Sequence, residues 1–211
     1  GALATNNRYS ARAPRANAAR KTCVLSDSHD RAELLLAAAQ ASIERGTEAF
    51  LHCGDLVEPD TLTGLQALGK PVHLVHGNNS GDLEALTTFS SRAESGIRYY
   101  GSEADFLLGG RRVFLSHYPE RTHEMASTGQ WDLLCCGHSH TTEITRISHG
   151  CRESVVVNPG TVAGIGAPVT YALGDLTTLE FEIHVLVNEA ATRQYPADSA
   201  RFSRTGEWEV C

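Results

Sequence analysis

Apolar, strand-like runs in this chain end again and again in aspartate, histidine or asparagine. The run "TCVLS" is followed at once by Asp27 and His29, "AFLHC" leads into Asp55, and "VHLVH" leads into Asn78 and Asn79. Ligands of layered α/β proteins bind in the crevice outside the carboxyl ends of the strands. The first half of the chain therefore predicts a cluster of polar side chains at one edge of a sheet.

The same pattern returns in the second half of the chain. The run "RRVFLSH" ends in His117, and "DLLCC" is followed by Gly137 and then by His138 and His140. Three of these polar residues follow a glycine, which lets the backbone turn sharply and approach closely. "SVVVN" adds Asn158, which we interpret as a residue that shapes a supporting loop rather than as a ligand.

Helical patterns separate the strand-like runs early in the chain, and strands follow one another later. Apolar spacing predicts a helix over residues 31–46, with Asp30 as its N-cap. Shorter helices are expected over residues 61–68 and 82–92, whereas residues 96–106 and 119–131 are expected to form the rim of the site. This order predicts an α/β fold with a large mixed sheet system.

Composition narrows the class of protein. The chain has 211 residues, 41% of them hydrophobic, and a net charge of −7, which argues against a general nucleic-acid-binding surface. No apolar run reaches the roughly 20 residues that a membrane helix needs. The six cysteines include no C-x-x-C pair, so we expect buried, reduced thiols and a reducing, cytoplasmic compartment.

We expect the domain itself to span residues 21–187. Residues 1–20 carry four arginines and no acidic residue, which is typical of a disordered leader or a cloning remnant. Residues 188–211 are polar again, with aromatic residues spaced through them. We expect this tail to pack either on the domain or at an oligomer interface.

The polar residues at the strand ends form a ligand set without a thiolate. Two carboxylates, four imidazoles and one carboxamide oxygen suit borderline divalent metals better than a sulfur-rich structural zinc site would. Seven ligands are too many for one metal and suit two metals if one carboxylate bridges them. The candidate ligands are Asp27, His29, Asp55, Asn78, His117, His138 and His140.

The ordered series D-x-H, G-D, G-N, H and G-H-x-H closely resembles the calcineurin-like metallophosphoesterases. With the N-P-G that follows the last ligand pair, the chain is most similar to the small bacterial and archaeal phosphodiesterases of that superfamily. The resemblance runs from about Lys21 to Val187. It implies a four-layer α/β/β/α sandwich of two mixed sheets flanked by helices, with the site at the edge of the sheets.

The resemblance also implies a binuclear metal centre and a reaction. The reaction would be hydrolysis of a small phosphodiester by in-line attack of a metal-bridging hydroxide, with manganese expected and Fe, Zn, Co or Ni as alternatives. Small relatives of this kind form homodimers or homotetramers. The implied ligands are Asp27, His29 and His140 for the first metal, Asn78, His117 and His138 for the second, and Asp55 as the bridge.

One position departs from the larger phosphatases of the superfamily. Those enzymes follow the G-N pair with a histidine that can protonate the leaving group, whereas this chain has Asn79. Asparagine cannot supply a proton, so we expect the metals to provide most of the catalysis. Activity should then favour substrates with good leaving groups.

Alternative functions remain open on the same site. A phosphomonoesterase or a dinucleoside polyphosphate hydrolase would use the same metals, because loops determine the choice of substrate. A non-catalytic scaffold is also known on this fold, in a subunit of the retromer sorting coat. Degenerate ligands would indicate a scaffold, and here all seven are intact, which favours an enzyme.

Overall fold

Two mixed β-sheets form the centre of the computed structural model, which describes residues 19–92, 94–186, 200–202 and 208–210. The six-stranded sheet has the order β11-β10-β1-β2-β3-β4. In it β1 to β4 run parallel, and β10 and β11 are antiparallel to their neighbours. Its strands are β1 (Lys21–Leu25), β2 (Ala49–His52), β3 (Val72–Leu74), β4 (Ile97–Tyr99), β10 (Thr170–Asp175) and β11 (Glu180–Val185).

The five-stranded sheet has the order β5-β6-β7-β9-β8. Its central strands β6, β7 and β9 are parallel, and the two edge strands are antiparallel to their neighbours. Its strands are β5 (Glu103–Leu108), β6 (Arg111–Ser116), β7 (Leu133–Cys135), β8 (Thr142–His149) and β9 (Arg152–Pro159). In the predicted tail, the described residues form a separate antiparallel pair, β12 (Ala200–Phe202) and β13 (Trp208–Val210).

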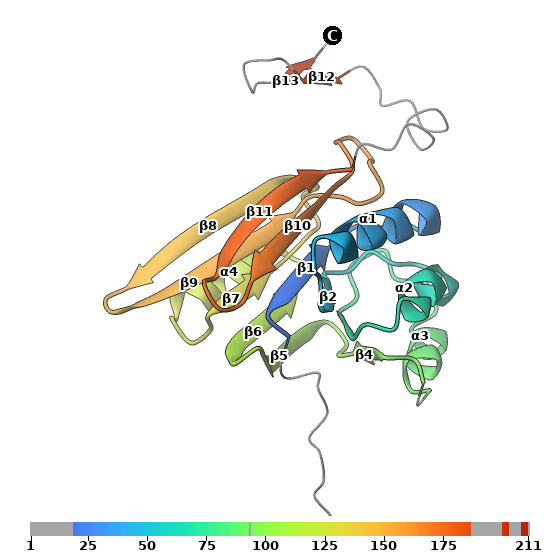
Figure 1. Ribbon diagram of the computed structural model, residues 1–211, viewed down its shortest axis with the longest axis horizontal. Coiled ribbons are helices and arrows are strands. Elements are labelled where there is room, and N and C mark those ends of the chain that lie inside the picture. Colours follow the sequence, from blue (N-terminus) through green and yellow to red (C-terminus); the bar gives the residue numbers. More distant parts are fainter. Residues whose placement is uncertain (1–18, 93, 187–199, 203–207, 211) are drawn as a thin grey trace, which may run out of the picture.

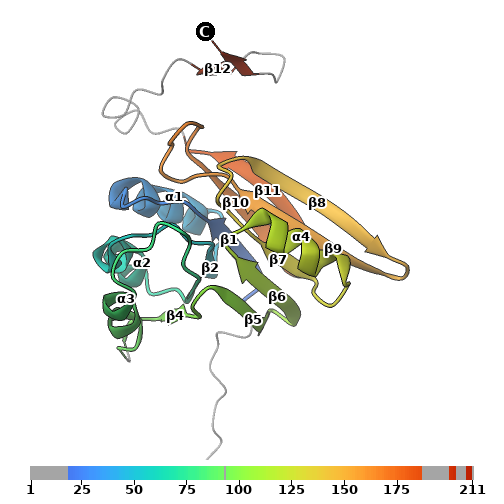
Figure 2. The same ribbon diagram turned by 180° about the vertical axis from the view of Figure 1, so that it is seen from behind.

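Helices cover the outer faces of the two sheets, so the domain has four layers (Figure 1; Figure 2). The predicted α/β/β/α sandwich is therefore confirmed. The first sheet carries α1 (Ala32–Glu44), the 3₁₀ helix η2 (Pro59–Leu62), α2 (Thr63–Ala67) and α3 (Leu83–Ser90), and the second carries α4 (Pro119–Ser127).

Three apolar clusters hold these layers together. The largest lies between the sheets, where Val24 and Leu51 of the first sheet belong to one buried cluster with Leu115 and Leu133 of the second. A second cluster joins the first sheet to α1, α2 and α3, and a third joins the second sheet to α4. Because both faces of each sheet are covered, the central strands are mostly apolar, and the candidate ligands lie just beyond their carboxyl ends.

The predicted cap of the first helix is wrong. Helix α1 begins after Arg31 without a side-chain cap, and the carboxylate of Asp30 instead accepts hydrogen bonds from the backbone of Val57 and Glu58. The sequence analysis also missed helix α4, which starts at Pro119 within the segment 119–131 that is expected at the rim. Proline is favoured at the first position of a helix, and this signal was available in the sequence.

The cysteine prediction holds for the interior and is wrong for one residue. Cys23, Cys53, Cys135 and Cys136 are buried free thiols, as expected, but Cys151 is exposed in the turn between β8 and β9. Cys211 lies outside the described residues. Among the helices of the described residues, none is long and apolar enough to cross a membrane.

Candidate metal centre

The seven candidate ligands follow the ends of five strands, and hydrogen bonds connect the two sheets at this edge. The backbone N–H of His138 donates to Asp27 Oδ2 over 3.0 Å, and the ring of His117 contacts the carbonyl of Cys53 over 2.8 Å. The ligands from the first sheet are Asp27 and His29 after β1, Asp55 after β2 and Asn78 after β3, and those from the second are His117 after β6 and His138 and His140 after β7.

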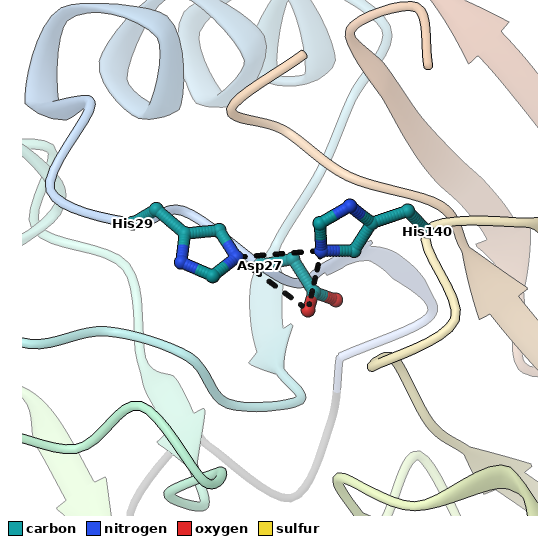
Figure 3. A group of neighbouring side chains, drawn as sticks. All are labelled: Asp27, His29 and His140. Atoms are coloured by element: carbon teal, nitrogen blue, oxygen red, sulfur yellow. Dashed lines mark hydrogen bonds and ion pairs between the residues drawn. The ribbon is translucent and has the colours of Figure 1, made fainter. Parts of the chain in front are cut away.

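Asp27, His29 and His140, here called the His29 group, bring three ligand atoms together (Figure 3). The two Nε2 atoms lie 3.3 Å apart, and His140 Nε2 lies 3.3 Å from Asp27 Oδ1. Asp27 is fully buried, and its Oδ1 atom has no hydrogen-bond partner. A buried carboxylate oxygen without a partner is costly, and a cation between it and the two imidazoles would satisfy it. The group therefore fits a metal ion.

The second cluster, here called the His117 group, consists of Asp55, Asn78, His117 and His138. The Nε2 atom of His117 lies 3.1 Å from Asn78 Oδ1, 3.2 Å from Asp55 Oδ1 and 3.2 Å from His138 Nδ1. The ligand atoms of Asp27, Asp55 and His117 also lie within 4.8 Å of one another. The carboxylates thus connect the two groups into one centre.

Backbone carbonyls select the ring nitrogen that His117 and His140 present to the centre. His117 Nδ1 donates to the carbonyl of Cys53 over 2.8 Å, and His140 Nδ1 donates to the carbonyl of Ile165 over 2.9 Å. A carbonyl only accepts, so each Nδ1 carries the proton and each Nε2 turns a lone pair toward the neighbouring ligands. Histidines that bind metals are commonly oriented in this way.

Asn79, the residue that departs from the larger phosphatases, holds the carboxylate of Asp55. Its backbone N–H donates to Oδ1 over 2.9 Å, and its side-chain Nδ2 donates to Oδ2 over 2.8 Å. Burial raises the pKa of Asp55, but these two hydrogen bonds and the nearby His117 and His29 outweigh burial and leave the pKa below its usual value. Asp55 is therefore kept in the ionised form that a metal ligand needs.

Five of the seven candidate ligands have a left-handed backbone. Asp27, His29, Asp55, His138 and His140 all have φ between 41° and 67°. Aspartate and histidine are among the residues that tolerate this region best, yet each case costs of order 1–3 kcal/mol. Such strain persists only where the surrounding structure enforces it, and here it is concentrated at the centre. The sequence contained no direct signal for it.

Two glycines permit the close approach that the sequence predicted. A Cβ atom at Gly77 would collide with Asp55 Oδ1, and one at Gly137 would lie 2.6 Å from Asp27 Oδ2 and closer still to the Ser26 hydroxyl. The backbone at these glycines therefore packs directly against both carboxylates.

Supporting contacts hold the ligand loops in place. Asn158 donates from Nδ2 to the carbonyl of Gly137 over 2.9 Å and to Ser139 Oγ over 3.1 Å, in agreement with its predicted supporting role. Thr161 Oγ1 donates to the carbonyl of Asp27 over 3.0 Å. The sequence analysis missed Thr161, because nothing in the local sequence relates it to a loop more than a hundred residues earlier.

Two histidines lie inside strands of the first sheet rather than beyond the strand ends. His52 and His73 are buried in β2 and β3 and are not among the candidate ligands. Burial lowers the pKa of His52 to about 3 and that of His73 to about 4, so both rings are neutral at pH 7. His73 Nδ1 contacts the hydroxyl of Tyr100 at 2.8 Å, and its ring stacks on Phe106.

Known proteins share this architecture. The model of the calcineurin-like phosphoesterase superfamily domain matches residues 21–179. A phosphodiesterase of Methanocaldococcus jannaschii is 27% identical over 80% of this chain and 99% of its own. A Methanothermobacter thermautotrophicus protein named "Probable metallophosphoesterase" is 33% identical over 65% of this chain and 74% of its own. The solved structure of an archaeal phosphodiesterase superposes with a TM-score of 0.71 at 22% identity, over 79% of this chain and 99% of that one.

Proposed function

This chain belongs to the calcineurin-like phosphoesterase superfamily, and we propose that it is a phosphodiesterase that uses two divalent metal ions to hydrolyse a small phosphodiester. The convergence of the ligand atoms around the unpartnered Oδ1 of Asp27 carries the proposal. In it, the His29 group holds the first metal, Asn78, His117 and His138 hold the second, and Asp55 bridges them. We expect manganese as the metal, the cytoplasm as the compartment, and a homodimer or homotetramer.

The residues of the chain prepare this centre for phosphoryl chemistry. Bound divalent ions would polarise the phosphoryl oxygens and lower the pKa of a water molecule. Asn79 keeps Asp55 ionised and fixes the orientation of its two oxygens through two hydrogen bonds. The carbonyls of Cys53 and Ile165 keep the Nε2 lone pairs of His117 and His140 available. The buried Asp27 Oδ1 has no hydrogen-bond partner, and a bound cation would satisfy it.

The leaving group receives no proton from position 79. An amide is not an acid at neutral pH, and Asn79 Nδ2 is already engaged with Asp55 Oδ2 at 2.8 Å. Departure of a poor leaving group should therefore be slow, since general acid catalysis typically contributes about 10²–10⁴-fold. Nitrophenyl diesters, whose leaving group needs no proton, are the substrates of choice for a first test.

The test strips the protein with a chelator, restores Mn²⁺, and compares bis-p-nitrophenyl phosphate with p-nitrophenyl phosphate. The proposal predicts metal-dependent turnover with preference for the diester, lost in Asp55→Ala and retained in the control His184→Ala. Preference for the monoester would indicate a phosphomonoesterase on the same site. Turnover of a dinucleoside polyphosphate alone would indicate a dinucleoside polyphosphate hydrolase, and failure to bind metal would overturn the proposal that the protein is an enzyme.

A further inference from the structure

Two exposed apolar side chains lie beside the metal centre, one at each group. Tyr118 directly follows His117 and is 42% exposed. Ile165 is 41% exposed, and its carbonyl is the one that accepts the hydrogen bond from His140. Holding the metal ligands in place does not require either of these side chains to be exposed. Both side chains flank candidate metal ligands, so they are placed where a bound substrate would contact them.

The ring of Tyr118 lies against the histidines of the His117 group. Its centroid is 5.2 Å from that of His117 and 5.1 Å from that of His138, with interplanar angles of 75° and 63°. These are edge-to-face contacts of the kind that aromatic rings prefer. They hold the ring next to two candidate ligands of the second metal while a large part of its surface remains open to solvent.

The backbone of Tyr118 is also fixed. It is the N-cap residue of α4, and its carbonyl accepts hydrogen bonds from the backbone N–H and the hydroxyl of Thr122, both over 3.1 Å. Pro119 follows it at the start of the helix. A tyrosine held in this way offers a large contact area and loses little conformational entropy when a ligand binds.

We propose that Tyr118 is a stacking platform for an aromatic base, and that the substrate is a nucleoside phosphodiester. This inference rests on the proposed function, because the metals would hold the phosphoryl group. A nucleoside places its base one sugar away from the phosphate, within reach of a ring that directly neighbours the ligands. Aromatic side chains bind bases by stacking, because every base has a π-face. Ile165 provides an apolar contact for the second substituent at the other end of the centre.

Calorimetric binding to the Mn²⁺-loaded protein tests this assignment without relying on turnover. Adenosine 5′-monophosphate and ribose 5-phosphate share the phosphate and the sugar and differ only in the base. The proposal predicts that the nucleotide binds about 5- to 150-fold more tightly, since stacking of one base on an aromatic side chain gives gains of this order. Tyr118→Ala should remove this difference without weakening ribose 5-phosphate, and Tyr118→Phe should preserve it.

A matched control removes an exposed apolar side chain elsewhere. Leu107 is 58% exposed on β5 and pairs with Arg112, at the end of the sheet opposite to His117, so Leu107→Ala should leave both affinities unchanged. Equal affinities for the two ligands, or equal weakening of both in Tyr118→Ala, would overturn the platform. So would hexyl phosphate binding as tightly as the nucleotide. If the phosphate ligands bind only with Mn²⁺ but show no gain from the base, the proposed function survives and this inference fails. If no binding depends on metal, the proposed function itself fails.

Discussion

The two groups of the metal centre differ in what holds their side chains in place. In the His117 group, the side chains of His117 and Asp55 are 1% and 3% exposed, His117 Nδ1 donates to the carbonyl of Cys53, and Asn79 donates two hydrogen bonds to Asp55. The other two members of this group, Asn78 and His138, are exposed. In the His29 group, the imidazoles of His29 and His140 are 20% and 24% exposed, and Asp27 Oδ1 has no hydrogen-bond partner.

This difference indicates that the two groups depend to different degrees on a bound metal ion to hold their side chains in place. In the His117 group, hydrogen bonds from the protein already hold His117 and Asp55 in position, so these two ligands need little ordering when an ion binds. The His29 group presents an unsatisfied carboxylate to two partly exposed rings and needs the ion to complete it. We therefore expect the His117 group to bind its metal more tightly, and the predictions below test this asymmetry.

The largest effect is expected from Asp27→Ala, because Asp27 contacts both halves. Its Oδ2 accepts the backbone N–H of His138, and its Oδ1 faces His140. Since metal-ion catalysis contributes several kcal/mol, turnover of bis-p-nitrophenyl phosphate should fall by about 10³-fold. Asp105→Ala, which removes a carboxylate paired with Arg112 on the surface, is the control and should change the rate less than about twofold. A loss below about tenfold in Asp27→Ala would contradict the ligand role.

Asn79→Ala should weaken one half selectively. The substitution removes the bond from Nδ2 to Asp55 Oδ2 and leaves the backbone bond to Oδ1 in place. Loss of a residue that orients a ligand typically costs about 10–100-fold in metal affinity. Asp55 Oδ2 lies 3.6 Å from His29 Nε2, whereas the retained backbone bond holds Oδ1, which lies 3.2 Å from His117 Nε2. Two-site Mn²⁺ titration calorimetry should therefore show the larger loss at the weaker site, that of the His29 group. A larger loss at the site of the His117 group would refute this division.

Comparison of Asn79→His with Asn79→Ala separates two roles of position 79: the hydrogen bond to Asp55 and proton donation to the leaving group. Both variants lose the Nδ2 hydrogen bond, but only the histidine can protonate a leaving group. Relative to the alanine variant, it should speed hydrolysis of phenyl diesters by up to about 10²-fold and of p-nitrophenyl diesters far less. An identical gain on both leaving groups would show that the histidine acts through the metals instead.

The smallest effect is expected from His73, which belongs to neither metal-binding group. Its pKa links the free energy of unfolding to pH. The unfolded residue binds a proton near pH 6.5, whereas the buried ring does so only near pH 4. The unfolded state therefore binds more protons between these values, so the free energy of unfolding should fall as pH drops from 6.5 toward 4, by about 1–3 kcal/mol. Urea unfolding of the metal-free protein should show this slope, and His73→Phe, which keeps the aromatic stack on Phe106, should reduce it. An unchanged slope would mean that His73 is not the titrating group.

The sequence was sufficient to predict the sheets and the place of the site for a simple physical reason. Buried parallel strands are apolar along their length, so a run that ends in Asp27 or Asp55 marks both the strand and the edge where ligands meet. The two sheets share that edge, and this brought His117 from the second half of the chain next to Asp55 of the first.

Tertiary contacts decided what the sequence could not show. Asp30 has the right position for a helix cap, but the backbone of residues 57 and 58 and the Thr61 hydroxyl compete for its carboxylate. The sequence analysis interpreted Asn79 only as the replacement of a proton donor. Its two hydrogen bonds to Asp55 depend on the three-dimensional position of that residue, which the local sequence does not show. The left-handed backbone of His138 and His140 likewise arises from contacts between loops, including the hydrogen bond from Asn158 to the carbonyl of Gly137.

The most direct test of the two-part centre is a crystal structure of the Mn²⁺-soaked protein with anomalous diffraction data. The account predicts two anomalous peaks roughly 3.5–4 Å apart, as in other two-metal sites, with Asp55 between them. One peak should contact Asp27, His29 and His140, and the other Asn78, His117 and His138. At limiting Mn²⁺ the peak in the His117 group should appear first. A single peak at saturating Mn²⁺, or peaks away from these side chains, would contradict the central claim.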